Sequence, residues 1–149
     1  MTKNTGPTVE FSLTVKDASS ALDFYYRAFG AEELYRMPTP DGGVAHGEFM
    51  IGNTKIYISD ECADWHASAM PEGASASCLF AIQTENCDDS FKRAVEAGGK
   101  PLNQPETYFW GSRSGMVLDP FGYRWSLSEV VEEISDEEME RRTKELFSV

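Results

Sequence analysis

The sequence predicts an α+β fold built from two tandem βαβββ modules and a C-terminal helix. Short segments alternate apolar and polar residues, as β-strands with one buried face do. Two longer segments repeat apolar residues at helical spacing and end at glycine. The order of these elements occurs twice at a constant offset of 69 residues, which places Asp17 on Asn86, Ala28 on Ala97 and Gly30 on Gly99. Chance similarity between two ordinary βα units is the alternative.

The first module begins with a strand and a helix. Val9 to Val15 alternates apolar and polar residues and predicts a half-buried strand. Asp17 and Ser19 then open a helix that Gly30 ends, because glycine readily adopts the left-handed conformation of a helix stop. Three further strands, joined by the turns TPDGG and GN, are expected at 33–37, 44–51 and 54–59.

The second module follows a loop, residues 60–76, that is rich in Ala, Ser, Pro and Gly. Its helix is expected at 86–98, and its strands at 77–84, 101–106, 112–118 and 123–129, with a DPFG turn before the last. We therefore expect a single domain over residues 1–149, made of modules at about 8–60 and 77–129.

Residues 135–147 predict a third helix. Ser135 and Glu138 form a capping box, in which each side chain can bond the other's backbone N–H. The apolar stripe is thin and consists of Met139, Leu146 and Phe147. We expect this helix to lie on a surface or across a subunit boundary.

The composition indicates a soluble globular protein and excludes several kinds of partner. Of its 149 residues, 41% are hydrophobic, and no run approaches the ~18 apolar residues of a membrane helix. The net charge of −12 repels phosphate groups, so neither nucleic acid nor an anionic membrane is an expected partner. The start, MTKNTGPTVEFS, has no export signal, so we expect a cytoplasmic location. The scattered Cys62, Cys78 and Cys87 lack zinc-site spacing and are expected to be reduced thiols.

Several motifs together carry a family resemblance: ALDFYYRAFGAE, RMPTPDGGVAHGEFMIGN, YFWGSRSG, DPFGYRWSL and EEISDEEMERR. They resemble the vicinal oxygen chelate superfamily, which includes glyoxalases, bleomycin-resistance proteins and extradiol dioxygenases, and within it the PhnB-like branch, often labelled 3-demethylubiquinone methyltransferase-like. The resemblance covers nearly the whole chain and implies a half-open curved sheet, or cup, and a homodimer. Methyltransferase activity is not expected, because no strand is followed by G-x-G-x-x-G.

Side-chain alternation on the expected strands assigns residues to this cup. On the last strand Tyr123, Trp125 and Leu127 belong to the core, so Arg124 and Ser126 face the cup. The same alternation on the other strands gives the rest of the lining: Glu10, Ser12, Thr14, His46, Glu48, Met50, Lys55, Tyr57, Gln83, Arg113, Gly115 and Ser128.

The resemblance also identifies four positions at which metal-dependent members carry His or Glu. Here they hold Glu10, Tyr57, Leu79 and Ser126, so three of the four ligands are missing. One carboxylate with a phenol and a hydroxyl is a poor site for a divalent cation. We expect no metal at the usual position and no cofactor. The alternative is a relocated metal site at Glu10, His46 and Glu48.

Some of the lining residues are candidates for chemistry. His46 and Glu48 are the candidate catalytic residues, because an imidazole beside a carboxylate can move protons near neutral pH. Simpler roles are a solvated strand histidine for His46, an aromatic plug at the mouth of the cup for Trp110, and a structural ion pair with Glu10 for Arg124. The expected ligand-binding residues are Glu10, Tyr57, Trp110, Arg113, Arg124 and Ser126.

We therefore expect a homodimeric protein that binds a small molecule of unspecified identity without the usual metal site. One alternative is an enzyme acting on a small metabolite through His46 and Glu48 or Glu10, with or without a divalent metal at an unusual position. The other is an antibiotic-sequestering resistance protein, which would suit an acidic chain that binds cationic drugs.

Overall fold

The computed structural model describes residues 6–148, so residues 1–5 and 149 of the expected domain lie outside the described part. The chain divides into two compact units, Met1–Glu72 (unit 1) and Gly73–Val149 (unit 2), and each is described by itself. Within residues 6–148 no helix is both long and apolar enough to cross a membrane.

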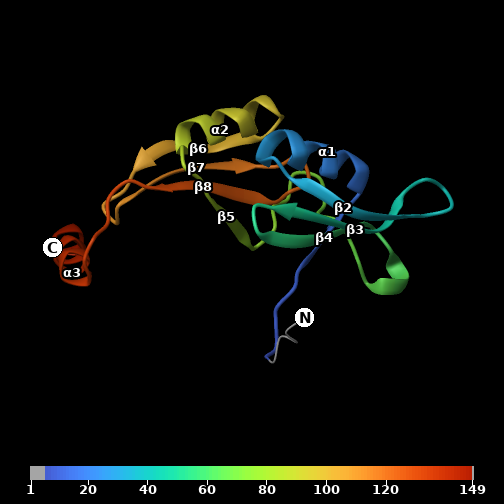
Figure 1. The fold of residues 1–149 in the computed structure, drawn as a ribbon, viewed down its shortest axis with the longest axis horizontal. Coiled ribbons are helices and arrows are strands. Elements are labelled where there is room, and N and C mark those ends of the chain that lie inside the picture. Colours follow the sequence, from blue (N-terminus) through green and yellow to red (C-terminus); the bar gives the residue numbers. More distant parts are fainter. Residues whose placement is uncertain (1–5, 149) are drawn as a thin grey trace. The chain divides into compact units, whose positions relative to one another are not determined.

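Unit 1 is a mixed sheet with a helix along one face (Figure 1). Its strand order is β1-β4-β3-β2, in which β1 is parallel to β4 and the other pairs are antiparallel. A short 3-10 helix, η1 (Ala63–Trp65), follows the sheet. The other elements of unit 1 are β1 (Ser12–Val15), α1 (Ala18–Phe29), β2 (Glu32–Pro38), β3 (Val44–Ile51) and β4 (Thr54–Asp60).

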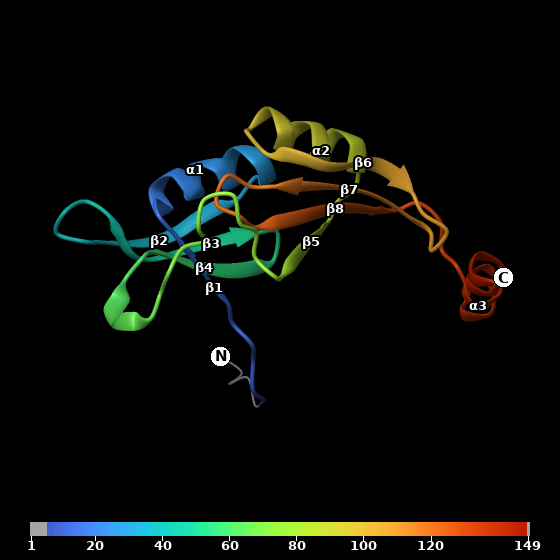
Figure 2. The same cartoon turned by 180° about the vertical axis from the view of Figure 1, so that it is seen from behind.

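Unit 2 repeats this arrangement, with strand order β5-β8-β7-β6 and with α2 along one face of the sheet (Figure 2). Here β5 is parallel to β8, and β8–β7 and β7–β6 are antiparallel. Its elements are β5 (Leu79–Gln83), α2 (Cys87–Glu96), β6 (Lys100–Thr107), β7 (Ser112–Leu118), β8 (Arg124–Val130) and α3 (Asp136–Phe147).

The two units share a register as well as an element order. Ser12 lies opposite Tyr57 in unit 1, and Ala81 lies opposite Ser126 in unit 2. Both positions of the second pair lie 69 residues beyond those of the first. The predicted α+β fold with two tandem βαβββ modules and a C-terminal helix is therefore confirmed. That the two units form one domain stays a prediction.

Helix α1 begins and ends where its sequence predicts. The Asp17 side chain accepts the N–H of Ser20 at 3.0 Å, which satisfies a donor that the helix leaves free. Gly30 ends the helix with φ 68°, in the left-handed region. The buried ring of Tyr25 stacks on Phe49 of β3, with ring centroids 5.3 Å apart, so the apolar side of α1 forms the core with the sheet.

The aromatic residues after DPFG belong to the core of unit 2. Asp119 is buried and accepts hydrogen bonds from the backbone N–H groups of Phe121 and Tyr123 and from the indole N–H of Trp125, each at 2.9 Å. One carboxylate thus holds the turn and orients the indole. Gly122 provides the positive φ of 96° that the turn requires.

Some predicted boundaries differ from the structure. The first strand begins at Ser12, not Val9, because pairing with β4 starts at Ser12, and Val9 is 93% exposed. Glu10 consequently precedes β1. The edge strands β2 and β6 extend beyond the predicted 33–37 and 101–106 at both ends.

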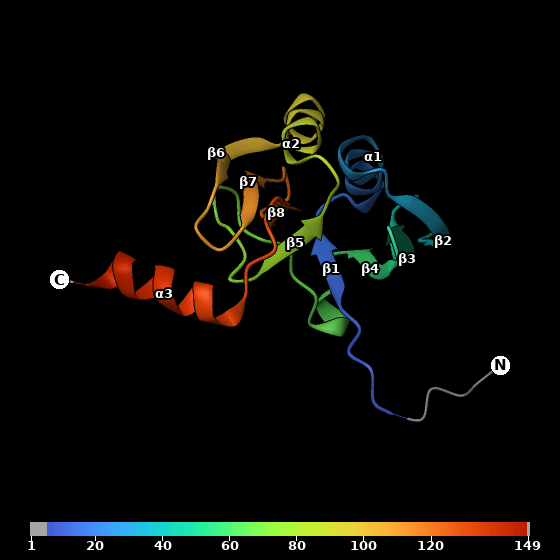
Figure 3. The ribbon, with the colours of Figure 1, turned by 60° about the vertical axis from the view of Figure 1, so that its left-hand side comes forward.

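Helix α3 extends away from the strands of unit 2 (Figure 3). Ser135 caps it by accepting the N–H of Glu138, which is one half of the predicted capping box. The other half is not formed, because the Glu138 carboxylate binds Arg141 and Arg142. Arg142 ties the helix to the turn between β6 and β7 by donating to the carbonyl of Phe109 at 2.9 Å. Leu146 and Phe147 of the thin apolar stripe are exposed, at 58% and 71%, whereas Met139 is half-buried.

Candidate functional site

The face of the unit 1 sheet opposite α1 carries polar and aromatic side chains. Leu13, Phe49 and Ile58 are buried on the face that α1 covers. Their neighbours in sequence point the other way, because side chains alternate along a strand. We call this opposite face, with Glu10 beside it, the unit 1 face. Its members include Ser12, Thr14 and Met50, as predicted, and Glu10, Tyr35, His46, Glu48, Lys55 and Tyr57.

The pairing of the four strands shows which residues lie at the centre of this face. Tyr35, Glu48 and Tyr57 lie side by side across β2, β3 and β4, and Ser12 of β1 lies next to Tyr57. Opposed residues of neighbouring strands share a face and are close enough for contact. The four strands therefore contribute one row of hydroxyl, carboxylate and phenol groups.

His46 and Glu48 are hydrogen-bonded, with 3.1 Å between Nε2 and Oε1. The other carboxylate oxygen of Glu48 lies 3.5 Å from the Lys55 ammonium. The bond with His46 and the charge of Lys55 lower the pKa of Glu48 below its usual value. An ionised carboxylate of low pKa is a poor proton acceptor, so Glu48 is suited to orient the imidazole of His46.

Tyr57 is held from three sides. Its hydroxyl donates to Glu10 Oε1 at 3.0 Å. Its ring lies 5.2 Å from the His46 ring, and the Lys55 ammonium is 4.9 Å from its centroid. These contacts fix an aromatic surface between two carboxylates and an ammonium, which suits a flat ligand with polar substituents.

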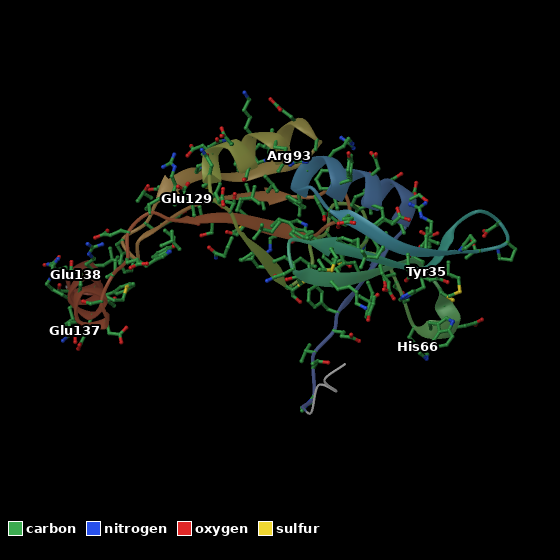
Figure 4. All side chains as sticks on the ribbon, viewed as in Figure 1. Tyr35, His66, Arg93, Glu129, Glu137 and Glu138 are labelled. Atoms are coloured by element: carbon green, nitrogen blue, oxygen red, sulfur yellow. The ribbon has the colours of Figure 1, made fainter. Side chains whose placement is uncertain are left out.

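Tyr35, labelled in Figure 4, also lies on the unit 1 face, although it was not predicted from the sequence. A bulge between Glu33 and Tyr35 shifts the alternation of β2, so Tyr35 faces the same side as Glu48. The His46 ring lies 6.3 Å from Tyr35, at a tilt of 48°. Neither Gly nor Pro marks the bulge in ELYRM, so the sequence carried no signal for it.

The residues at the family's four metal positions do not fit a divalent cation. In unit 1 the Tyr57 hydroxyl donates a hydrogen bond to the Glu10 carboxylate, so the groups at these two positions are paired with each other. In unit 2 the equivalent positions are the side chain of Leu79 and the hydroxyl of Ser126. No three His, Cys, Asp or Glu side chains within residues 6–148 are grouped so as to hold a metal ion, and this includes Glu10, His46 and Glu48.

In unit 2 the face opposite α2 carries Arg124 and Ser126 of β8, as the alternation predicted, while Trp125 and Leu127 are buried beneath α2. We call this the unit 2 face. Ser128 of β8 lies on it too. The neighbouring strands add the residues opposite these three positions, which are Leu79, Ala81 and Gln83 of β5 and Ser114, Met116 and Leu118 of β7.

Trp110 lies in the turn between β6 and β7. It stacks on Tyr108 with ring centroids 4.4 Å apart and remains 44% exposed. The stacked pair lies outside the strands that form the unit 2 face. Its predicted part in ligand binding stays a prediction.

The predicted placement of Arg113 and Gly115 in the cup is wrong. Gly115 lies opposite the buried Leu127 and therefore faces α2. Arg113 is two positions before Gly115 on β7, so it points to the same side. A Cβ on Gly115 would lie 2.7 Å from the Phe91 ring of α2. Arg113 is bound on that side by both carboxylate oxygens of Asp88, at 2.7 and 2.8 Å.

The predicted ion pair between Arg124 and Glu10 would join the two units and stays a prediction. Within unit 1 Glu10 accepts a hydrogen bond from Tyr57. Of the sequence-predicted site residues, the structure brings together Glu10, His46, Glu48 and Tyr57 on the unit 1 face, and Arg124 and Ser126 on the unit 2 face.

Comparison with known proteins agrees with this architecture. Residues 8–127 match the family described as Glyoxalase/Bleomycin resistance protein/Dioxygenase superfamily. An uncharacterized protein of Mycobacterium bovis is 35% identical over 144 residues, which cover 94% of each chain. Protein YjdN of Escherichia coli is 27% identical, over 76% of this chain and 88% of its own.

Two solved structures show the same fold. A gene product of Arabidopsis thaliana has a TM-score of 0.68 at 23% identity, covering 83% of this chain and 99% of its own. A protein of Bacillus cereus described as a putative 3-demethylubiquinone-9 3-methyltransferase, PhnB protein, has a TM-score of 0.64 at 16% identity, with the same coverage. Identities this low establish the fold alone.

Proposed function

We propose that this chain, which belongs to the Glyoxalase/Bleomycin resistance protein/Dioxygenase superfamily, binds a small molecule without the superfamily's usual metal site. The observation that carries the proposal is the interlocked set of side chains on the unit 1 face. Tyr57 is fixed by Glu10, His46 and Lys55, and none of these side chains is needed for the core beneath them. Polar groups held in place on an open sheet face are typical of a binding surface.

The chemistry of this face indicates what the ligand offers. Tyr35, His46 and Tyr57 present rings for stacking, and Glu10 and Glu48 present carboxylates that accept hydrogen bonds. A planar compound with N–H or O–H donors at its rim matches both. Lys55 adds one positive charge beside Glu48.

Native mass spectrometry of freshly purified protein tests the proposal. We expect a bound small molecule in the wild-type chain and its loss in His46→Asn and Tyr57→Leu. His66→Asn is the matched control, because His66 lies in the loop after η1, at φ 54°, where asparagine is tolerated. A compound retained equally by His46→Asn, Tyr57→Leu and the control would contradict a site on the unit 1 face.

A second candidate function is catalysis of a proton transfer, and the 3.1 Å contact of His46 with Glu48 favours it. His46 would carry the proton, and Glu48 would orient the ring. Turnover of the co-purifying compound by the wild type, lost in His46→Asn while binding persists, would support catalysis. Binding without turnover would leave the protein a binder.

We further propose that the chain is a homodimer, as the family resemblance implies. Light scattering on the purified protein should then give twice the chain mass of 16.6 kDa. The exposed Leu146 and Phe147 of α3 are apolar surface that a second subunit would cover. A mass equal to one chain at all concentrations would contradict this. The cytoplasmic location stays a prediction from the sequence.

A further inference from the structure

The guanidinium of Arg124 forms no hydrogen bond or ion pair within the described part of unit 2. Its Nε is buried and has no hydrogen-bond partner among residues 6–148. No ion pair within the described part of unit 2 includes it. By contrast Arg113, Arg141 and Arg142 all bind carboxylates, at 2.5–2.7 Å. A buried N–H donor without an acceptor is costly, so its persistence calls for an explanation.

The strands beside Arg124 make this position less polar than the rest of the unit 2 face. Leu79 of β5 and Leu118 of β7 lie opposite it on either side. One repeat further along β8, Ser126 lies between Ala81 and Met116. Apolar neighbours reduce the solvation of a guanidinium and strengthen its attraction to an anion.

We propose that Arg124 binds the carboxylate of a small organic acid on the unit 2 face. A guanidinium donates two parallel N–H bonds, through Nε and one Nη, to the two oxygens of a carboxylate. That pairing would satisfy the orphaned Nε. Lys100 of β6, which lies opposite Leu118, adds a second cationic side chain to this face. The apolar Leu79, Ala81, Met116 and Leu118 match a carboxylate with a hydrocarbon segment better than they match phosphate.

The rest of the face fits the body of such an acid. Ala81 and Met116 lie one strand repeat from Arg124, a step of about 7 Å, and supply apolar contact. One repeat further, Ser128 lies between Gln83 and Ser114, whose side chains can bond a polar group at the far end. The ligand is therefore a carboxylate with a short hydrocarbon segment next to it. This inference goes beyond the proposed function, because it concerns unit 2 and requires none of the unit 1 residues.

Titration of the full-length protein with defined probes tests the inference. The probes are benzoate and hexanoate, their neutral analogues benzamide and hexanamide, and inorganic phosphate. The readout is the Nε–H signal of Arg124 in ¹H–¹⁵N spectra, together with the backbone amides of residues 124–128. We expect benzoate or hexanoate to shift these signals saturably, and the amides and phosphate to bind at least about tenfold more weakly.

Two Arg→Met variants with equal charge change provide the comparison. Arg124→Met should weaken carboxylate binding at least about tenfold, whereas Arg93→Met, on α2 (Figure 4), should leave it unchanged. Arg124→Met should also melt no lower than Arg93→Met, because it removes an unsatisfied buried donor. If Arg124→Met fails to fold, the wild-type comparison of carboxylates with amides still decides.

Several results would overturn the inference. These are amides or phosphate binding as tightly as the carboxylates, no saturable shift with either acid, or undiminished binding by Arg124→Met. A shift of the Arg124 Nε–H signal in ligand-free Glu10→Gln would also overturn it, because Glu10 would then be the partner. Loss of a co-purifying ligand in His46→Asn has no bearing on these outcomes, so the proposed function and this inference can fail separately.

Discussion

The carboxylate of Asp60 accepts a hydrogen bond from the backbone N–H of Ala18 at 2.7 Å, which ties the end of β4 to the first turn of α1. In unit 2 the carboxylate of Glu129 accepts the N–H of Cys87 at 2.9 Å in the same way. Both partners of the second bond lie 69 residues beyond those of the first. The repeat therefore extends to single hydrogen bonds, and in both units an acid satisfies a free N–H at a helix N-terminus.

The two acids differ in how many donors they satisfy, and this predicts unequal effects of removing their charge. Asp60 also accepts the N–H of Val44 at 2.8 Å through its second oxygen, whereas Glu129 needs only one oxygen for Cys87. An amide has one acceptor oxygen, so Asp60→Asn should lower the free energy of unfolding by about 1–3 kcal/mol and Glu129→Gln by less than about 1 kcal/mol. Urea denaturation of both variants measures the difference. Equal losses would contradict this account.

Asp119 should be the residue of unit 2 least tolerant of a neutral replacement. It is buried, and its two oxygens accept from Phe121, Tyr123 and the Trp125 indole. Asp119→Asn would point an NH₂ group at one set of these donors and leave it unpaired, which should cost about 2–4 kcal/mol. Near-ultraviolet circular dichroism of Trp125 would report the disturbed turn, and urea denaturation the lost stability. A variant as stable as the wild type would show that the turn does not depend on this carboxylate.

Helix α3 should depend on pH through Glu138. Hydrogen bonds from Arg141 and Arg142 lower its pKa to about 2. A lowered folded-state pKa means that these pairs stabilise α3 fully above the usual value of 4.5 and that this stabilisation is lost as pH falls through about 2. Amide hydrogen exchange of residues 136–147 measures the loss.

The matched control for this pH dependence is the neighbouring glutamate. Glu138→Gln should raise exchange in α3 at neutral pH more than Glu137→Gln does. Both glutamates are labelled in Figure 4, and both changes remove one negative charge from the first helical turn, where such a charge is favourable. Of the two, only Glu138 binds Arg141 and Arg142. Equal exchange in the two variants would show that the arginine pairs add nothing to α3.

Local signals in the sequence were sufficient to predict most of the fold. Helix ends were predicted from single residues. In the structure Asp17 and Ser135 each accept a backbone N–H at a helix start, and Gly30 ends α1 in the left-handed conformation. The alternation of β8 correctly separated the buried Trp125 from Arg124, because Trp125 and Leu127 on one face alternate with Arg124 and Ser126 on the other. Features of this kind depend on residues near one another in the chain.

The wrong predictions concern strand faces that are determined by contacts with residues far away in the sequence. Strand β7 has an apolar residue on each side, Met116 on one and Val117 on the other. The alternation of its sequence therefore could not show that the Val117 side is the buried one. The side that faces α2 is the one with Gly115, because the ring of Phe91 packs so close to this position that a Cβ would lie 2.7 Å from it. The bulge that turns Tyr35 toward Glu48 is likewise set by pairing between strands.

Arg113 and Arg124 were both predicted to bind ligand, and the structure separates them. Arg113 is held by Asp88 on the face that α2 covers, whereas Arg124 lies on the unit 2 face without a partner in its unit. Arg113→Met should therefore leave benzoate binding unchanged, in contrast to Arg124→Met. Because the pair with Asp88 is partly exposed, its loss should change the midpoint of urea denaturation little. Weaker benzoate binding in Arg113→Met than in Arg124→Met would mean that the assignment of faces in β7 is wrong.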